Sequence, residues 1–193
     1  MVSNERSSGK LGKSERYGLT VASTFPAVIL VDANFLVAHA DPKISSDDRA
    51  RINYFLEQAE KNKSRLIIPM PAIAEYLVGA DVAALDTLNI LEKKSYVYCA
   101  PFDRASAYEC ALLDRAAIGG GDKKDSIDQA WQKIKIDRQI IAIAKANGAK
   151  LIISKDIGVQ TNAKRVGIST IDIQGLELPE RAKQKVLPLK PRK

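Results

Sequence analysis

Four acidic residues stand where a parallel sheet would bring them to one edge. They are Asp32, Glu75, Asp137 and Asp156. Asp32 directly follows the apolar run Val28–Val31, and Asp156 lies just beyond a later apolar run. We expect Glu75 one turn into the helix after another strand, and Asp137 at the start of the helix that leads toward Asp156. Because the carboxyl ends of parallel strands meet at one edge, the four carboxylates are predicted to share one pocket.

A pocket with four carboxylates needs positive charge, since neighbouring carboxylates raise one another's pKa. The sequence pattern commits no Lys, Arg or His side chain to these acids. A hard divalent cation would neutralise them, and oxygen ligands suit Mg²⁺ or Mn²⁺. Such an ion activates water at neutral pH and neutralises charge on a phosphoryl oxygen. The predicted reaction is therefore phosphodiester hydrolysis by a metal-activated water.

Each acid also has a purely structural interpretation, which stays open when that residue is taken singly. Asp32 and Asp137 could cap the helices that follow them. Asp156 could lie in an ordinary turn, and Glu75 could be a solvated helix residue. Four such coincidences of position together favour a shared site.

Other side chains have supporting or structural roles in this prediction. Asn34 stands two residues after the first of the acids and Ser154 two residues before the last. Both are short polar groups that can orient a carboxylate or a water. His39, the single histidine, falls on an apolar helical face and is predicted to be structural rather than a general base. Cys99 and Cys110 form neither a disulfide framework nor a zinc motif.

Apolar runs alternate with helical periodicity along the chain. Strands are predicted at 28–31, 65–69, 95–100, 150–154 and 168–173. Helices are predicted just after Asp32, at 47–62, from Pro71, at 81–93, at 103–118, from Asp137 to Asn147 and at 161–166. The segment around Trp131 has no settled pattern. This alternation predicts an α/β fold with a parallel sheet covered on both faces by helices.

One domain with two basic ends accounts for the whole sequence. Residues 27–174 are the predicted domain, 1–26 a flexible N-terminal tail and 175–193 a basic tail rich in Pro and Lys. The net charge of +7 lies in these ends, because residues 1–26 hold four basic and two acidic residues and 178–193 hold six and one. Basic tails attract polyanions such as nucleic acid, or simply keep the protein soluble. Residues 119–128 read as a glycine-rich loop.

The sequence contains no candidate for membrane insertion. No apolar stretch approaches the roughly 20 residues that span a bilayer. The N-terminal residues are polar and lack the apolar centre of a signal peptide. With two cysteines and no disulfide framework, the prediction is a cytoplasmic protein in a reducing compartment.

Three segments of the sequence are VILVDANFLVA, PAIAEYL and KIDRQIIAIAKANGAKLIISKD. Together they resemble the PIN-domain ribonucleases, the group that includes the VapC-type toxins of toxin–antitoxin pairs. The last is the most specific, with an acid before an apolar helix, then Gly-Ala, an apolar strand and Ser-x-Asp. The resemblance covers about residues 27–174. It implies a three-layer α/β/α sandwich with a central, mostly parallel sheet, and a Mg²⁺- or Mn²⁺-dependent endoribonuclease.

The same resemblance implies a site and partners. The acidic site would be formed by Asp32, Glu75, Asp137 and Asp156, with Asn34 and Ser154 beside it. The substrate would be RNA. Members of the family commonly form homodimers, and toxin members are inhibited by a cognate antitoxin, so both are expected here. Two departures concern the toxin role more than the nuclease chemistry: Ser154 stands where threonine is usual, and the gap between Glu75 and Asp137 is long.

Other functions remain as alternatives. One is an RNA-processing or RNA-binding PIN protein without a toxin role. A weaker one is an α/β phosphatase or receiver-like protein in which Asp32 accepts a phosphoryl group. A phosphatase would have a second acid two residues later, where this chain has Asn34, and a receiver would have an aspartate near the third strand, where it has CAPF.

Overall fold

The protein is described from a computed structural model that covers residues 25–121, 123–124 and 130–183. Most of the predicted N-terminal tail lies outside the described residues. The same holds for residues 122 and 125–129 of the glycine-rich loop and for 184–193 of the C-terminal tail. Within the described part of the chain, no helix is long and apolar enough to cross a membrane.

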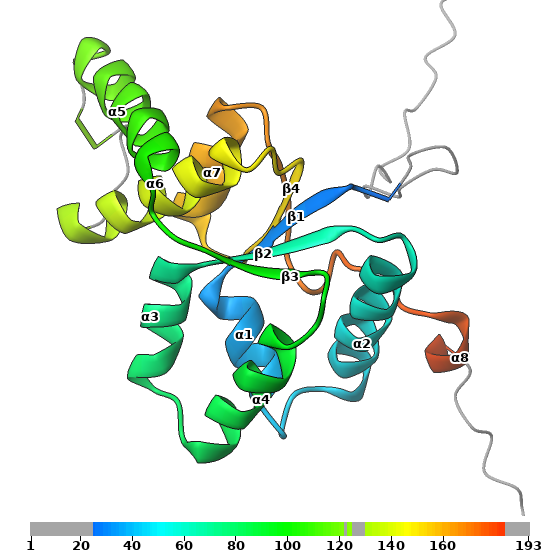
Figure 1. Ribbon diagram of the computed structural model, residues 1–193. Coiled ribbons are helices and arrows are strands. Elements are labelled where there is room, and N and C mark those ends of the chain that lie inside the picture. Colours follow the sequence, from blue (N-terminus) through cyan, green and yellow to red (C-terminus); the bar gives the residue numbers. More distant parts are fainter. Residues whose placement is uncertain (1–24, 122, 125–129, 184–193) are drawn as a thin grey trace, which may run out of the picture.

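The described residues form one parallel sheet with the strand order β3-β2-β1-β4-β5 (Figure 1). The strands are β1 (Val28–Val31), β2 (Arg65–Pro69), β3 (Val97–Ala100), β4 (Leu151–Ile153) and β5 (Ser169–Ile171). The chain builds the sheet outward from β1 to β3, then returns to place β4 on the other side of β1. The boundary between β1 and β4 is therefore the topological switch point, where ligands bind in open α/β sheets.

Successive residues of the central strands point to opposite faces of the sheet, and each face has its own core. Ile29 and Val31 of β1 belong to one buried cluster, and Leu30 between them belongs to the other. Because β1 is covered on both faces, it reads in the sequence as a continuous apolar run. The predicted α/β architecture with a central parallel sheet is confirmed.

Helices cover both faces (Figure 1). One cluster is built with α1 (Ala33–Ala40), α2 (Ser46–Lys61), α3 (Met70–Val78) and α4 (Val82–Glu92). The other is built with α5 (Arg104–Gly119), α6 (Trp131–Ala146) and α7 (Ile157–Arg165). A last short helix, α8, spans Glu180–Lys183. Leu176, which the sequence analysis assigned to the C-terminal tail, is 5% exposed and packs in the first cluster.

Two helices, α6 and α7, begin several residues earlier than the sequence predicted. α6 begins at Trp131 and places Asp137 in its interior, so the expectation that Asp137 opens this helix is wrong. Ile134, fully buried, shares the inward stripe with Ile141, one heptad later, and this packing extends the helix past the polar residues between them. α7 begins at Ile157 rather than Thr161, because the Asp156 side chain caps its first turn.

Candidate active site

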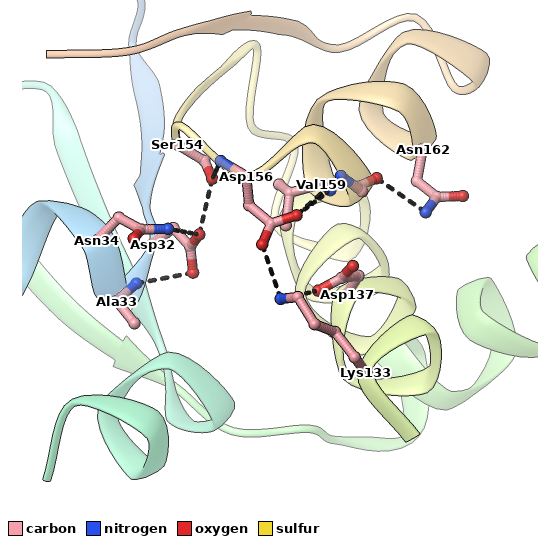
Figure 2. Close-up of polar contacts among 10 residues, drawn as sticks. Asp32, Ala33, Asn34, Lys133, Asp137, Ser154, Asp156, Val159 and Asn162 are labelled. Atoms are coloured by element: carbon pink, nitrogen blue, oxygen red, sulfur yellow. Dashed lines mark hydrogen bonds and ion pairs between the residues drawn. The ribbon is translucent and has the colours of Figure 1, made fainter. Parts of the chain in front are cut away.

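The site is built at the switch point, where β1 and β4 end side by side. Val31 and Ile153 are paired across the two strands, and the Asp32 backbone N–H donates to the Ile153 carbonyl oxygen at 3.1 Å. The next residues along the two strands, Asp32 and Ser154, are thereby brought together. The Ser154 hydroxyl donates to Asp32 Oδ2 at 2.7 Å, in an interaction that joins residues far apart in the chain (Figure 2).

Asp32 is a buried carboxylate held by several uncharged donors. Its side chain is the N-cap of α1, because Oδ1 accepts a hydrogen bond from the Ala33 N–H at 2.7 Å. Oδ2 accepts from Ser154 and, at 3.2 Å, from the Asn34 side-chain amide. The residue is 3% exposed. Asp32 therefore caps α1 and, through Oδ2, also contacts Ser154 and Asn34 of the site, so capping does not remove it from the site.

Asp156 is the N-cap of α7 and divides its two oxygens between two tasks. Oδ1 accepts from the Gly158 and Val159 N–H groups at 2.8 and 3.4 Å. Oδ2 lies 2.7 Å from the Lys133 ammonium nitrogen. The Asp156 N–H also donates to the Ser154 hydroxyl oxygen at 3.0 Å, so Ser154 bridges two of the acids. Burial opposes ionisation of Asp156, but Lys133 and the amide donors outweigh it and hold its pKa below the usual value.

Asp137 projects from the interior of α6 and is 1% exposed. Its Oδ1 is 3.5 Å from Lys133 Nζ, and its buried Oδ2 finds no hydrogen-bond partner among the described residues. Burial raises the pKa of Asp137 to about 6; Lys133 works against this rise, and the negative charges of Asp156 and Asp32 add to it. A buried carboxylate oxygen without a donor is costly in free energy unless a cation or a proton satisfies it.

Glu75 reaches the same group of charges from α3. This helix starts at Met70, directly after β2, with Pro71 in its first turn. Partial burial raises the pKa of Glu75, the charges of Asp32 and Asp156 raise it further, and Lys133 lowers it. Unlike Asp32 and Asp137, Glu75 is exposed to solvent.

Lys133 is a member of the site that the sequence analysis missed. Its ammonium group lies between Asp156 and Asp137, and the charges of both acids help to raise the pKa of Lys133 against the opposing effect of burial (Figure 2). The expectation that no basic side chain is committed to the acids is therefore wrong. The usable signal was the spacing of four residues between Lys133 and Asp137, which places both on one helical face. That signal was hidden because the helix was not extended back to Trp131.

The chemical type of the ligands suits a hard divalent cation, but the present arrangement of the side chains does not form a complete metal site. The acids supply only oxygen ligands, and the unpartnered Asp137 Oδ2 is a buried atom that a cation would satisfy. Yet within residues 25–121, 123–124 and 130–183, no group of three or more His, Cys, Asp and Glu side chains is arranged to hold a metal ion. The Lys133 ammonium, at 2.7 Å from Asp156 and 3.5 Å from Asp137, lies where these carboxylates converge.

Comparisons with solved structures identify the fold. The described architecture is similar to a chain of VapBC2 from Rickettsia felis bound to a DNA fragment from its promoter, with 16% identity, a TM-score of 0.54, and coverage of 75% of this chain and 98% of that one. It is also similar to a chain of VapBC-1 from nontypeable Haemophilus influenzae, with 12% identity, a TM-score of 0.50, and coverage of 76% and 98%. No family model and no curated protein matches the sequence.

At these identities the likeness concerns the fold. The protein has the PIN-like fold of the VapC toxins, and the resemblance seen in the sequence is confirmed at that level. The individual roles of the acids rest on the geometry of this chain.

Proposed function

We propose that this protein is a metal-dependent endoribonuclease of the PIN type, and that it acts as the toxin of a toxin–antitoxin pair. One observation carries the nuclease proposal: carboxylates from the ends of β1 and β4, from α3 and from α6 converge at the switch point of a PIN-like sheet. Four acids at such an edge exceed what capping requires, since capping accounts only for Asp32 and Asp156.

The residues of the site have distinct roles in the proposed reaction. Asp32, Glu75, Asp137 and Asp156 would hold Mg²⁺ or Mn²⁺. When bound, the ion supplies a Lewis acid that lowers the pKa of water and neutralises charge on the phosphodiester. Ser154 fixes the Asp32 carboxylate and the Asp156 backbone in one geometry. The Asn34 side-chain amide donates a second hydrogen bond to Asp32 Oδ2.

Glu75 is the acid best placed to handle the proton of the reaction. It is exposed, and its pKa is raised by burial and by the neighbouring carboxylates, so it is a better proton acceptor than an ordinary glutamate. In hydrolysis, a water oxygen bonds to phosphorus, the bond from phosphorus to the leaving sugar oxygen breaks, the water proton passes to a base, and the leaving oxygen takes up a proton from solvent. Glu75 supplies that base without disturbing the buried Asp32.

RNA and an antitoxin are the proposed partners. The similar structures from Rickettsia felis and Haemophilus influenzae are VapBC assemblies, and the first is bound to promoter DNA. That supports an antitoxin as a partner, and the homodimer is proposed on the sequence resemblance alone. A cytoplasmic location suits the two free thiols, Cys99 and Cys110.

Cleavage of RNA tests the proposal directly. Purified protein is incubated with single-stranded and structured RNA and Mn²⁺, beside Asp32→Asn, Asp137→Asn and the control Asp86→Asn, an exposed acid on α4. We expect both site variants to cut at least about 100-fold more slowly, since removing one electrostatic group from such a site costs on this order. Asp86→Asn should cut like the wild type. Cleavage that persists in Asp32→Asn would contradict the proposal.

An RNA-binding protein that does not cut is the second candidate, and the ion pair of Lys133 with Asp156 favours it. A permanently docked lysine would neutralise the acids without a metal. RNA that binds the wild type and stays intact at saturating Mn²⁺ would select this function. The phosphatase or receiver alternative is not favoured, because Asp32 is 3% exposed and both of its oxygens are engaged by donors.

A further inference from the structure

Lys133 reaches the acids from an unfavourable position. It is the third residue of α6, and the positive end of a helix dipole disfavours a cation in the first turn. The helix start offers it no compensation, because Ala130 at the N-cap has no side-chain acceptor. The ammonium group instead lies 2.7 Å from Asp156 and 3.5 Å from Asp137. Its placement is explained by the carboxylates of the site and not by the helix that carries it.

We infer that Lys133 is a tethered counter-ion that occupies the cation position of the site, so that docking of its ammonium and binding of a divalent metal exclude each other. The inference rests on the proposed function, because it concerns the same four acids. It adds that Lys133 sets the affinity of the site for metal, and so the metal concentration at which the site fills.

The competition is for one particular oxygen. Asp156 Oδ1 is committed to the N–H groups of Gly158 and Val159, which leaves Oδ2 as the oxygen that faces the site. Lys133 takes this Oδ2 at 2.7 Å. A metal ligated by Asp156 would use the same oxygen, and two positive charges cannot share it at contact distance without strong repulsion.

The site is also incomplete while the lysine is docked. Lys133 approaches Asp137 Oδ1 only at 3.5 Å, and Asp137 Oδ2 remains buried without a partner among the described residues. One ammonium therefore satisfies Asp156 well and Asp137 poorly. A divalent ion carries twice the charge and binds several oxygens at once, so it compensates the acids better.

Lys133 can leave without rearrangement of the fold. Its side chain is 41% exposed, while that of Asp137 is 2% exposed. The lysine stem is flexible and its ammonium is readily hydrated, so the ion pair can break toward solvent while the carboxylates stay in place. Release of the Lys133 side chain then opens the rigid site to a metal ion, and docking of the side chain closes it to metal.

Metal binding by charge variants tests the inference. Binding of Mn²⁺ to the metal-free full-length chain is followed by the electron paramagnetic resonance signal of free Mn²⁺, for the wild type, Lys133→Met, Lys133→Arg and Lys135→Met. We expect Lys133→Met to bind Mn²⁺ about fivefold or more tightly than the wild type, because the ammonium no longer has to be displaced and coupling free energies between two binding events typically correspond to 5- to 150-fold in affinity. Lys133→Arg keeps the cation and should stay within about threefold of the wild type. Lys135→Met removes an equal charge from an exposed position of the same helix and should also leave the affinity unchanged.

A second measurement uses the wild type alone, so it does not depend on the folding of a variant. Lysines are labelled at constant pH with an amine-reactive acylating reagent, with EDTA or with saturating Mg²⁺, and quantified by mass spectrometry. Mg²⁺ should increase labelling of Lys133 severalfold and leave Lys135 unchanged. Equal labelling of Lys133 in both conditions would overturn the inference.

The outcomes separate this inference from the proposed function. If wild type and Lys133→Met bind Mn²⁺ equally and the wild type cleaves RNA, the counter-ion role is wrong and the nuclease stands. If Lys133→Met binds more tightly but no RNA is cut, the competition is real and the nuclease proposal fails. If neither protein binds Mn²⁺, both are wrong.

Discussion

Asp32 and Asp137 are equally buried carboxylates of one site, and their surroundings are opposite. Asp32 accepts hydrogen bonds from Ala33, Ser154 and Asn34, so both of its oxygens are satisfied by uncharged donors. Asp137 has only a distant lysine at Oδ1, and its Oδ2 has no partner within the described part of the chain. The fold itself stabilises the first carboxylate and leaves the second dependent on a cation.

Position in the secondary structure causes this difference. Asp32 lies between a strand and a helix, where the first N–H groups of α1 have no partners within the helix. Asp137 lies inside α6, where backbone N–H groups already donate to carbonyls one turn back, so the helix offers its side chain no donors. Asp32 is therefore held rigidly by the fold, whereas Asp137 requires a positive charge nearby.

Removal of the satisfied acid should have the largest effect on stability. Asp32→Ala deletes the N-cap of α1 and two side-chain hydrogen bonds of a buried charge, so we expect a loss of about 3 kcal/mol in the free energy of unfolding. Urea denaturation in EDTA measures it, and exposed Asp86→Ala should change the same quantity by less than about 0.5 kcal/mol. If Asp32→Ala were as stable as the wild type, the fold would not be stabilising this carboxylate.

Removal of the unsatisfied acid should have the opposite sign. Burial raises the pKa of Asp137 from 3.8 to about 6, so between these values the folded state binds more protons than the unfolded state. The contribution of Asp137 to stability therefore falls as pH rises from about 4 to about 6, and stays low above that. In EDTA, Asp137→Asn should be more stable than the wild type by about 2 kcal/mol at pH 7 and equal to it near pH 4.

Urea denaturation at the two pH values measures this difference, and Mn²⁺ provides the control. Metal should stabilise the wild type at pH 7 and leave Asp137→Asn nearly unchanged, because the variant lacks one charge of the site. An Asp137→Asn protein that is less stable than the wild type at pH 7 in EDTA would show that Oδ2 is satisfied in solution.

The sequence was sufficient for the α/β architecture, because fully buried strands leave apolar runs and β1 and β2 carry clear ones. The strand order depends on pairing between distant segments, such as Val31 with Ile153, for which short runs contain no signal. Asp32 and Asp156 were placed correctly at strand ends. Capping and convergence, treated as alternatives for Asp32, occur together there. Asp156, for which an ordinary turn was the alternative, also caps a helix and belongs to the site.

The sequence was not sufficient for the charge balance of the site. Lys133 was missed because polar residues interrupt the apolar stripe through Ile134. The sequence does not show that Ile134 is buried, and only this burial reveals that the helix extends back to Trp131. The position of Asp137 was misjudged for the same reason. An acid at a helix start finds backbone donors and one in a helix interior does not, so this error concealed the unsatisfied oxygen.

Ser154 links the two parts of the site, and its removal should have a moderate effect. Its hydroxyl donates to Asp32 at 2.7 Å and accepts from the Asp156 N–H at 3.0 Å, in a position that is 2% exposed. Ser154→Ala should lose about 1.5 kcal/mol in urea denaturation and also slow RNA cleavage. Ser154→Thr keeps the hydroxyl and should retain cleavage within a few-fold. A loss of cleavage in the threonine variant equal to that in the alanine variant would exclude the hydroxyl as the cause.

The ion pair between Lys133 and Asp156 should have the smallest effect on stability. Their side chains are 41% and 16% exposed, so solvent partly screens the pair, and we expect a coupling energy of about 1 kcal/mol from a double-mutant cycle of Lys133→Met and Asp156→Asn in EDTA at pH 7. Asparagine keeps the cap of α7, which confines the cycle to charge. The coupling should weaken in 1 M salt, and a cycle with Lys135→Met should give none.

A strong coupling would break the comparison between the two acids, because Lys133 would then be a permanent part of the fold. A weak one means that a divalent ion has little to displace at Asp156 Oδ2. The same ion also satisfies Asp137, which the lysine reaches only at 3.5 Å. The ion pair of Lys133 with Asp156 is weak, and buried Asp137 lacks a good partner. Exchange of the lysine for a metal ion is therefore favourable.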